Sequence, residues 1–253
     1  KVLSTEPYKG VRDFYPDDFR VHAYILNTWR STLQSFGYEE YDGSILEPAE
    51  LYRAKSGEEI VNEQTYTFMD RGEREVTLRP EMTPTVARLV AGRVREFGYP
   101  LRLFSVPNLF RYERPQRGRL REHWQLNADI FGVSNTEAEM ELISISSKLL
   151  HNFGLKDNQF VIKVSSRKLI NAIMTDWYEL NEDKAKKLTK LIDRKSKMSA
   201  DEFEAKAKEI TGKAFKFLTL NHESETYKEA TAILSVKEAL EEVQGVINTL
   251  YAR

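Results

Sequence analysis

The chain of 253 residues contains no cysteine. Without thiols it can form neither disulfides nor thiolate metal sites, which is weakly indicative of a reducing compartment. The four histidines are scattered and show no H-E-x-x-H spacing, which argues against a zinc enzyme. We therefore expect no metal site built from protein ligands alone.

Long apolar runs are absent as well. No apolar stretch reaches the roughly 18 residues that a membrane span needs, and the N-terminal KVLSTEPYKG lacks the apolar core of a secretory signal. It also lacks an initiating methionine, which indicates trimming at one or both ends. We expect no membrane association and a cytoplasmic location.

Neither sign of charge is in excess, since 38 basic residues face 39 acidic ones and the net charge is −1. A nearly neutral chain does not attract polyanions through bulk charge, so any affinity for anions must be local. The G-x-x-x-x-G-K-[ST], G-x-G-x-x-G and G-x-S-x-G loops are also missing. A nucleotide, if one binds, must be held in another way.

Apolar residues make up 41% of the chain, enough for a folded core. Helical spacing predicts helices over 17–36, 83–97 and 137–153, the first capped by Asp17 or Asp18 and the second by Thr83. An extended stretch ends near Pro48, and a hairpin turns at 70–72. Further strands are predicted over 101–110, 123–132 and 160–164.

From about Ser165 onward the pattern is almost entirely helical. Ser-x-x-Glu capping boxes at Ser199 and Ser235 mark two helix starts. The sequence therefore predicts an α+β fold, in which an antiparallel sheet flanked by helices occupies residues 1–165 and a small all-helical domain occupies residues 166–253. No regular βαβ alternation occurs, which argues against a doubly wound sheet.

Five arginines lie in the eleven positions 111–121, with Glu113 as the only acid among them. If one strand carries Arg111 and Glu113, both side chains project from the same face about 6–7 Å apart. That pair suits a nucleotide. A guanidinium can donate two parallel hydrogen bonds to a phosphate, and a carboxylate can accept a hydrogen bond from the exocyclic amine of a base. The return strand places Gln125, Asn127 and Asp129 at alternate positions, and such a polar face is costly in a sheet unless it binds something.

Two simpler interpretations stay open at this point. The arginines can form surface ion pairs with some of the many acids. Alternatively, Arg114 and Arg117 can hold the phosphates of a nucleic acid, although this leaves the polar face of the return strand unexplained.

The stretch FRYERPQRGRLREHWQ resembles motif 2 of the class II aminoacyl-tRNA synthetases. Together with TLRPEMT upstream and GVRDFYP near the start, it is similar to the histidyl-tRNA synthetases in particular. The resemblance covers Tyr8 to about Val164 and continues more loosely through the helical region. It implies a ligase of protein biosynthesis that converts histidine and ATP to histidyl-adenylate and then transfers the histidyl group to tRNA(His).

The resemblance also implies roles for single residues. Arg111 is the catalytic residue, which holds the α-phosphate and the histidine carboxylate, and Glu113 binds the adenine amine. Arg119, with Arg121 as a second candidate, holds the outer phosphates of ATP, and Mg²⁺ accompanies them. The residues assigned to the histidine pocket are Glu81, Met82, Thr83, Arg111, Gln125 and Asp129.

The family further implies a homodimer formed through the motif 1 region, over the predicted helix 17–36 and the strand after it. The helical region corresponds to an insertion domain that approaches the tRNA acceptor end, and residues 184–197 carry seven basic residues against one acid. A solvated helix face explains that stretch equally well.

The chain lacks motif 3 and the anticodon-binding domain of the family, so we expect it to be weakly active or inactive alone. A non-catalytic regulatory subunit of ATP phosphoribosyltransferase, which shares the fold, is the alternative function. Such paralogues tend to lose the motif 2 arginines, whereas Arg111, Glu113 and Arg119 are all present here.

Overall fold

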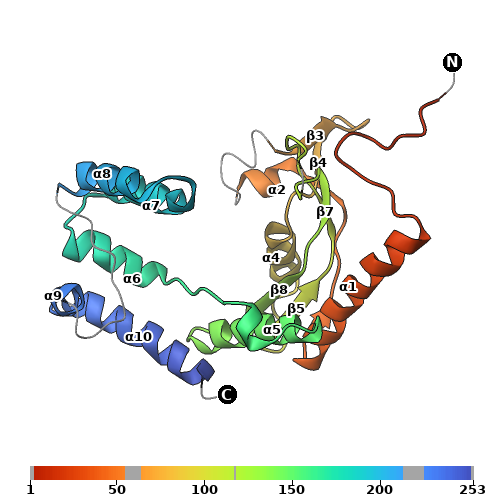
Figure 1. The fold of residues 1–253 in the computed structure, drawn as a ribbon. Helices are drawn as coiled ribbons and strands as arrows, with labels where there is room; N and C mark the ends of the chain where they lie inside the picture. The colour runs from red at the N-terminus through yellow and green to blue at the C-terminus, as the bar shows by residue number, and fades with distance from the viewer. Residues whose placement is uncertain (1–2, 55–63, 117, 213–224, 252–253) are drawn as a thin grey trace. The chain divides into compact units, whose positions relative to one another are not determined.

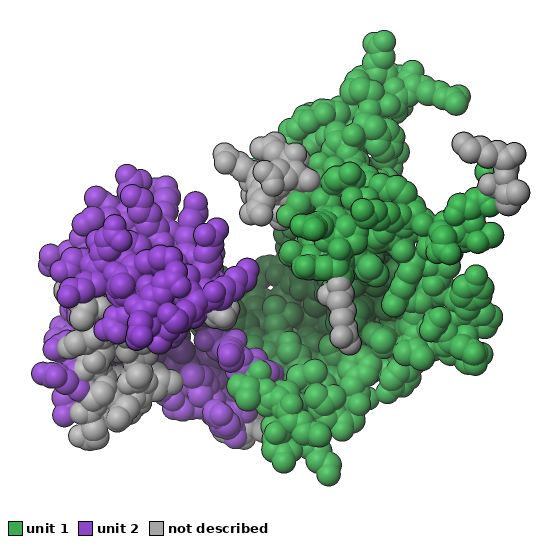
Figure 2. Space-filling view, turned by 45° about the horizontal axis from the view of Figure 1, so that its top comes forward, with its two compact units in different colours: residues 1–161 green, residues 162–253 purple. Residues whose placement is uncertain are grey.

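The computed structural model describes residues 3–54, 64–116, 118–212 and 225–251. Arg117 of the arginine-rich loop and His222 lie outside these ranges. Internal contacts divide the chain into two compact units, residues 1–161 and residues 162–253, which are coloured separately in Figure 2.

The first unit contains short strands that pair in three sheets. The sheets comprise β1 (Glu39–Glu40), β5 (Leu101–Ser105) and β8 (Asn127–Phe131); β2 (Leu46–Pro48), β4 (Glu75–Leu78) and β3 (Tyr66–Met69); and β6 (Asn108–Phe110) with β7 (Glu122–Trp124). Among these described strands only β1 and β5 are parallel, and the other pairs are antiparallel. The predicted α+β class is confirmed.

The two long strands predicted around the arginine-rich loop are each broken once. One breaks at Val106–Pro107, between β5 and β6, and the other at Gln125–Leu126, between β7 and β8. Pro107 has no N–H to donate to a ladder, but its carbonyl accepts a hydrogen bond from the Gln125 N–H at 3.1 Å. The hairpin therefore continues around a bend and does not run straight.

The helices of this unit are α1 (Pro16–Ser35), α2 (Ala49–Arg53), α4 (Thr83–Gly92) and α5 (Glu137–Asn152), with the short 3-10 turn η1 (Asp157–Gln159). The predicted caps were wrong at two starts. Tyr15 and Met82 are the N-caps of α1 and α4, and neither provides a side-chain cap. Pro16 starts α1, where its missing N–H costs nothing, and α4 ends at Gly92, five residues before the predicted end.

Helices cover both faces of the sheet formed by β1, β5 and β8, with α4 and α1 on opposite sides (Figure 1). Successive strand residues alternate between the faces. Phe104 packs with Leu33 of α1 and Ile145 of α5, whereas Leu103 packs with Val86 of α4. The face toward α4 is thus apolar at one end, and it is also the face that carries Ser105, Asn127 and Asp129.

The strand predicted over 160–164 does not form, although the structure describes all five residues. The segment pairs with no other strand, and Val161 is 81% exposed. An apolar β-branched run forms a strand only where a neighbouring strand and a surface to bury it are available.

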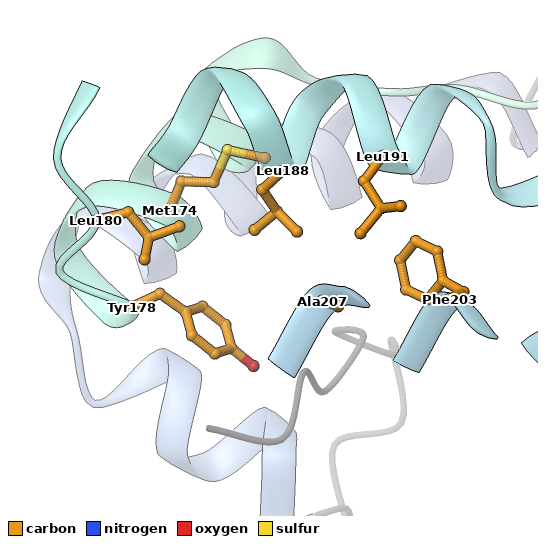
Figure 3. Close-up of a cluster of buried hydrophobic side chains, with 7 residues drawn as sticks. All are labelled: Met174, Tyr178, Leu180, Leu188, Leu191, Phe203 and Ala207. Carbon is orange, nitrogen blue, oxygen red and sulfur yellow. The ribbon is translucent and has the colours of Figure 1, made fainter. Parts of the chain in front are cut away.

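The second unit is helical, as predicted. Its elements are α6 (Arg167–Ala172), the π-helical turn η2 (Ile173–Trp177), α7 (Glu182–Asp193), the 3-10 turn η3 (Lys195–Lys197), α8 (Ala200–Thr211), α9 (Glu225–Thr231) and α10 (Leu234–Tyr251). Figure 3 shows side chains that converge between α7, α8 and the segment around η2, among them Leu188, Phe203 and Met174. This cluster is the core of the α7–α8 pair.

One of the two predicted helix caps in this unit is confirmed. The Ser199 hydroxyl accepts a hydrogen bond from the Glu202 N–H and begins α8. The other was wrong, because α10 already begins at Leu234 and the Ser235 hydroxyl donates instead to the Asp176 carboxylate at 2.5 Å. Within the described ranges, no helix combines the length and the apolar character that crossing a bilayer requires.

Candidate active site

Arg79, just after β4, joins the separate sheets of the first unit. The side chain is 2% exposed. Its Nε donates to the Asn108 carbonyl at 3.0 Å, and its Nη1 donates to the Gly43 carbonyl at 2.7 Å and to the Asp42 carboxylate at 2.8 Å. A planar guanidinium can serve several acceptors at once, so Arg79 fixes the end of β4 against both β6 and the loop that follows β1.

The predicted amino-acid-binding residues, Glu81 to Thr83, follow Arg79 directly. Met82 is fully buried, whereas Thr83 is exposed at the N-terminus of α4. The Tyr52 hydroxyl donates to the Glu81 carbonyl at 3.4 Å. Since the N-terminus of a helix carries partial positive charge, this end of α4 favours a bound carboxylate.

Arg111 is half-buried beside this segment. Its Nε donates to the Pro80 carbonyl at 3.0 Å, and its backbone N–H donates to the Arg121 carbonyl at 2.9 Å. The arginine predicted to be catalytic is therefore bonded to Pro80, the residue directly before the segment predicted to hold the amino acid.

Arg111 and Glu113 do not share a strand, contrary to the prediction. The strand β6 ends at Phe110, and the Glu113 N–H donates to the Arg111 carbonyl at 2.8 Å, which tightens the chain into a turn. The Glu113 side chain is only 9% exposed and forms an ion pair with Arg119, which is 60% exposed. The loop itself thus brings a carboxylate and a guanidinium together.

Arg121 has the contacts of a structural residue. It is buried, its Nε donates to the Glu113 carbonyl at 3.0 Å, and its Nη1 donates to the Tyr8 hydroxyl at 3.0 Å. Its guanidinium lies 4.1 Å from the centroid of the Tyr112 ring. Gly10 comes so close that an added Cβ would lie 2.8 Å from the Arg121 side chain. These contacts hold the N-terminal segment against the loop.

His123 was not predicted as part of the site. Burial and then the Arg111 guanidinium lower the pKa of its imidazole, while the Glu113 carboxylate raises it. The side chain is therefore within electrostatic reach of both loop residues. The sequence contained a signal for it, because His123 shares the alternation of Gln125 and Asn127.

The polar face predicted on the return strand is present. The Gln125 side-chain amide donates to the Asn127 Oδ1 at 2.8 Å. In the ladder between β5 and β8, Asn127 pairs with Ser105 and Asp129 pairs with Leu103. Burial raises the pKa of the Asp129 carboxyl.

Tyr41 connects this polar face to the Arg79 side of the site. Its N–H donates to the Phe104 carbonyl at 2.9 Å, which holds it beside β5. Burial raises the pKa of the Tyr41 hydroxyl to about 12; among its neighbours, Ser105 lowers that pKa and Asp129 and Asp42 raise it. Asp129, Tyr41 and the Asp42–Arg79 pair are thus close enough to influence one another.

Comparison with known proteins identifies relatives along most of the chain. The family model described as histidyl-tRNA synthetase matches residues 10–253. The chain is 50% identical over 203 residues to the histidine–tRNA ligase of Leptospira biflexa, covering 80% of this chain and 46% of that one. It is 47% identical over 172 residues to that of Thermoplasma volcanium, covering 68% and 40%. The chain thus spans less than half the length of these curated relatives.

Solved structures share the fold. The histidyl-tRNA synthetase from Nostoc sp. PCC 7120 matches with a TM-score of 0.77 at 18% identity, over 98% of this chain and 58% of that one. A Bacillus halodurans protein titled ATP phosphoribosyltransferase regulatory subunit/histidyl-tRNA synthetase matches with a TM-score of 0.76 at 22% identity, over 100% and 66%. At such identities the likeness concerns the fold alone. From the family match and the two curated relatives, it follows that the chain belongs to the histidyl-tRNA synthetase family.

Proposed function

We propose that the chain carries part of the active site of a histidine–tRNA ligase. In this reaction the histidine carboxylate attacks the α-phosphorus of ATP, pyrophosphate leaves, and the histidyl group then moves to the 3′ end of tRNA(His). The observation that supports this best is the hydrogen bond from Arg111 to the Pro80 carbonyl. It keeps a cation beside the segment that holds Glu81 and Thr83, where the two substrates must meet.

On the nucleotide side, the ion pair between Glu113 and Arg119 exchanges its partners when ATP binds. The Glu113 carboxylate then accepts from the adenine amine, and the exposed Arg119 turns to the outer phosphates. Arg111 contacts the α-phosphate and stabilises the charge that develops there during attack. Arg121 acts through its contacts with Glu113 and Tyr8 by holding the loop in place.

On the histidine side, Glu81 pairs with the α-ammonium group and Thr83 contributes its hydroxyl. Met82, which stands between them in the sequence, is fully buried and anchors the backbone there. Gln125, oriented by Asn127, completes the polar wall, and Asp129 accepts a hydrogen bond from an imidazole N–H.

No general base is needed, because the attacking group is already a carboxylate. Catalysis then consists of positioning and charge neutralisation. Mg²⁺ would supply further neutralisation of the phosphates. Among the described residues no group of three or more His, Asp or Glu side chains is placed to hold a metal ion.

The proposal extends to partners and domains. Residues 1–165 would form the synthetase core and residues 166–253 the insertion domain that meets the tRNA acceptor end. A homodimer would form through α1, where Phe19, Val21 and Tyr24 are exposed apolar residues. The cytoplasmic location stays a prediction from the sequence.

The regulatory-subunit alternative is disfavoured by the arginine-rich loop. A subunit that binds no nucleotide has no need for Arg111 beside Pro80 or for the Glu113–Arg119 pair. The curated relatives named above, which reach 50% identity, are also ligases by name.

Calorimetric titration with histidine and a non-hydrolysable ATP analogue tests the proposal. We expect both ligands to bind weakly, and Arg111→Ala to weaken nucleotide binding at least tenfold, since a charged hydrogen bond contributes about 1.5–3 kcal/mol. Arg114→Ala is the matched control, because Arg114 is an exposed residue of the same loop. Wild-type nucleotide affinity in the Arg111→Ala variant would contradict the proposal, as would the absence of any histidine binding.

A further inference from the structure

A buried carboxylate, that of Glu47, lies in the first unit apart from the site residues named so far. Glu47 is the middle residue of β2 and is 4% exposed. Its Oε1 accepts a hydrogen bond from the Thr85 hydroxyl at 3.2 Å and one from the Arg88 guanidinium at 2.6 Å. Thr85 and Arg88 are three residues apart on α4 and thus share one face of the helix. Because a buried carboxylate is costly unless it is paired and hydrogen-bonded, this cluster ties the first half of α4 to β2.

Thr85 connects Glu47 to Tyr52 of α2. Thr85 is fully buried, and Tyr52 is 1% exposed. Since the Thr85 proton goes to Glu47, the Thr85 oxygen accepts from the Tyr52 hydroxyl, which lies 3.1 Å away. Burial raises the pKa of the Tyr52 hydroxyl to about 12, so this group keeps its proton at neutral pH. The Glu81 carbonyl lies 3.4 Å from the same hydroxyl, and the Tyr52 proton is therefore shared between two acceptors.

The methyl group of Thr85 is in contact with Gly43. A Cβ added at Gly43 would lie 2.6 Å from the Thr85 Cγ2, a distance at which one of the two residues has to move. The Gly43 carbonyl accepts in turn from Arg79. Thr85 is thus held on two sides, with its hydroxyl between Glu47 and Tyr52 and its methyl against the loop that Arg79 anchors.

The segment of residues 80–82 depends on such contacts for its position. It belongs to no helix or strand, so regular backbone hydrogen bonding does not orient Glu81. Two successive carbonyls of the segment each face a side-chain donor, since Pro80 accepts from Arg111 and Glu81 faces Tyr52. A small displacement of a ligand-binding group is enough to weaken its contact with the ligand steeply.

We propose that Thr85 is a positioning residue for the amino acid: with Glu47 and Tyr52 it fixes the backbone at Glu81, so that the Glu81 carboxylate meets the α-ammonium group. The inference rests on the proposed function, in which Glu81 pairs with that group. Thr85 itself is fully buried and acts only through its neighbours. Arg111 is held by Pro80, and nucleotide binding should therefore not depend on Thr85.

The decisive variant is Thr85→Val, which replaces the hydroxyl with a methyl group of similar size. We expect its dissociation constant for L-histidine to rise about tenfold, with the constant for the ATP analogue unchanged. Thr85→Ser keeps the hydroxyl and should bind histidine as wild type does.

A second ligand separates the orientation of Glu81 from general damage to the pocket. Imidazolepropionate keeps the ring and the carboxylate of histidine but has no ammonium group for Glu81 to bind. Wild type and Thr85→Val should therefore bind it with equal affinity. A pocket that is merely loosened would lose affinity for both ligands.

Thr32→Val is the matched control. Thr32 is 1% exposed, and its hydroxyl donates to the Thr28 carbonyl at 2.7 Å and accepts from the Asn152 amide at 2.8 Å. It belongs to α1, on the other side of the sheet from α4 (Figure 1). Both threonine-to-valine variants should lower the urea midpoint, because each removes a buried hydrogen-bonded hydroxyl. Only Thr85→Val should weaken histidine binding.

Titrations by calorimetry, or by NMR at millimolar ligand, decide between the outcomes. If wild type binds histidine and Thr85→Val binds it equally well, the inference is overturned while the proposed function stands. It is also overturned if Thr32→Val or Thr85→Ser weakens histidine binding as much as Thr85→Val does, or if Thr85→Val loses imidazolepropionate to the same extent.

Tyr52→Phe tests the same connection should Thr85→Val not fold, because it removes one oxygen and keeps the ring. Its dissociation constant for histidine should rise while that for the ATP analogue stays unchanged, and wild-type affinity for histidine would overturn the inference. If wild type binds no histidine at all, the proposed function fails and this inference fails with it.

Discussion

At the scale of single residues, His22 of α1 has an unusual environment for an imidazole. Its ring stacks on Phe14 at 4.5 Å between centroids and meets Trp124 edge-on at 4.6 Å. Both ring nitrogens are buried without a hydrogen-bond partner in the described structure. Burial, and then the Arg12 guanidinium, lower the pKa of the imidazole. His22 is therefore neutral at neutral pH, and it packs in the folded protein as an aromatic residue.

The lowered pKa of His22 makes stability depend on pH. In the unfolded chain a histidine binds a proton near pH 6.5, whereas the folded protein resists protonation to a lower pH. The contribution of His22 to stability is thus complete above about pH 6.5, where both states are neutral, and it decreases as the pH falls below that value. His123, whose pKa burial also lowers, contributes in the same direction.

Replacing His22 with phenylalanine should keep the stacking and remove this proton. We expect the His22→Phe variant to lose less stability than wild type between pH 7 and pH 5, with some loss remaining because of His123. Urea midpoints can be followed by the fluorescence of Trp29 and Trp124, which line the same groove as His22. His151→Gln, at a partly exposed position, serves as the control. Equal losses in wild type and His22→Phe would show that the His22 interpretation is wrong.

At the scale of elements, Arg79 connects strands that belong to different sheets. Its backbone N–H donates to the Ile45 carbonyl at 2.9 Å, and its own carbonyl accepts from the Phe110 N–H at 3.0 Å. The side chain then adds contacts to Asn108 and Gly43. Most of this stabilisation comes from the carbonyl acceptors, which are partly buried, because Asp42 is largely exposed and its ion pair is screened by water.

Replacing Arg79 with lysine should weaken both ligand sites together. An ammonium group cannot serve the Asn108 and Gly43 carbonyls in the same planar geometry, so we expect a loss of about 2–4 kcal/mol in the free energy of unfolding. Binding of histidine and of the ATP analogue should both weaken, since β4 and β6 lose their common anchor.

Arg102→Lys is the matched control for that experiment. Arg102 forms a bidentate pair with Glu141 at 2.7 and 2.8 Å, and it lies on the face of the sheet that packs against α5. We expect this variant to be destabilised by about 1 kcal/mol, with ligand affinities unchanged. Equal effects of the two variants on binding would show that Arg79 is a general stabilising residue without a positioning role.

The elements themselves were largely predictable from sequence. Helical periodicity located α1 and α5 to within a residue or two, because each buries one apolar stripe. Three predictions failed where the outcome depends on distant parts of the chain. The strand at 160–164 lacked a partner, the strands around the arginine-rich loop bent at Pro107, and the Ser235 hydroxyl was taken by Asp176 instead of capping α10.

The site was predictable only in part, for the same reason. Alternation along the return strand indicated a polar face and led to Gln125 and Asp129. It gave no indication of Tyr41, which lies far from the return strand in sequence and comes beside it because β1 pairs in parallel with β5 and the Tyr41 N–H continues that pairing to the Phe104 carbonyl. The turn at Glu113 could not be predicted either, because the same short sequence is compatible with a tight turn and with a strand.

At the scale of the whole molecule, the net charge is close to zero, but one groove carries a local excess of positive charge. A groove of about 530 Å³ lies between α7 and α8, and its floor includes Leu191, Met198 and Ile210. Its charged lining residues are Lys184, Lys187, Lys190, Arg194, Lys206 and Glu209. Five cations line the groove against one acid, and one of them, Lys206, also pairs with Glu202 at 2.6 Å. Such a lining suits an extended anion. Under the proposed function that anion is the backbone of the tRNA acceptor stem.

Removing two groove cations should therefore weaken RNA binding in a salt-dependent way. Each phosphate contact contributes about 0.7–0.9 to the slope of log K against log salt, so we expect Lys187→Gln/Lys190→Gln to reduce the slope for an acceptor-stem hairpin by about 1.5. Lys168→Gln/Lys186→Gln removes the same charge from two lysines that are paired with Glu242 and Glu182 outside the groove. Fluorescence anisotropy between 50 and 200 mM salt, roughly the range in which counterion release dominates, measures both slopes. If the two double variants reduce the slope equally, RNA responds to the charge of the unit as a whole and the groove is not its binding site.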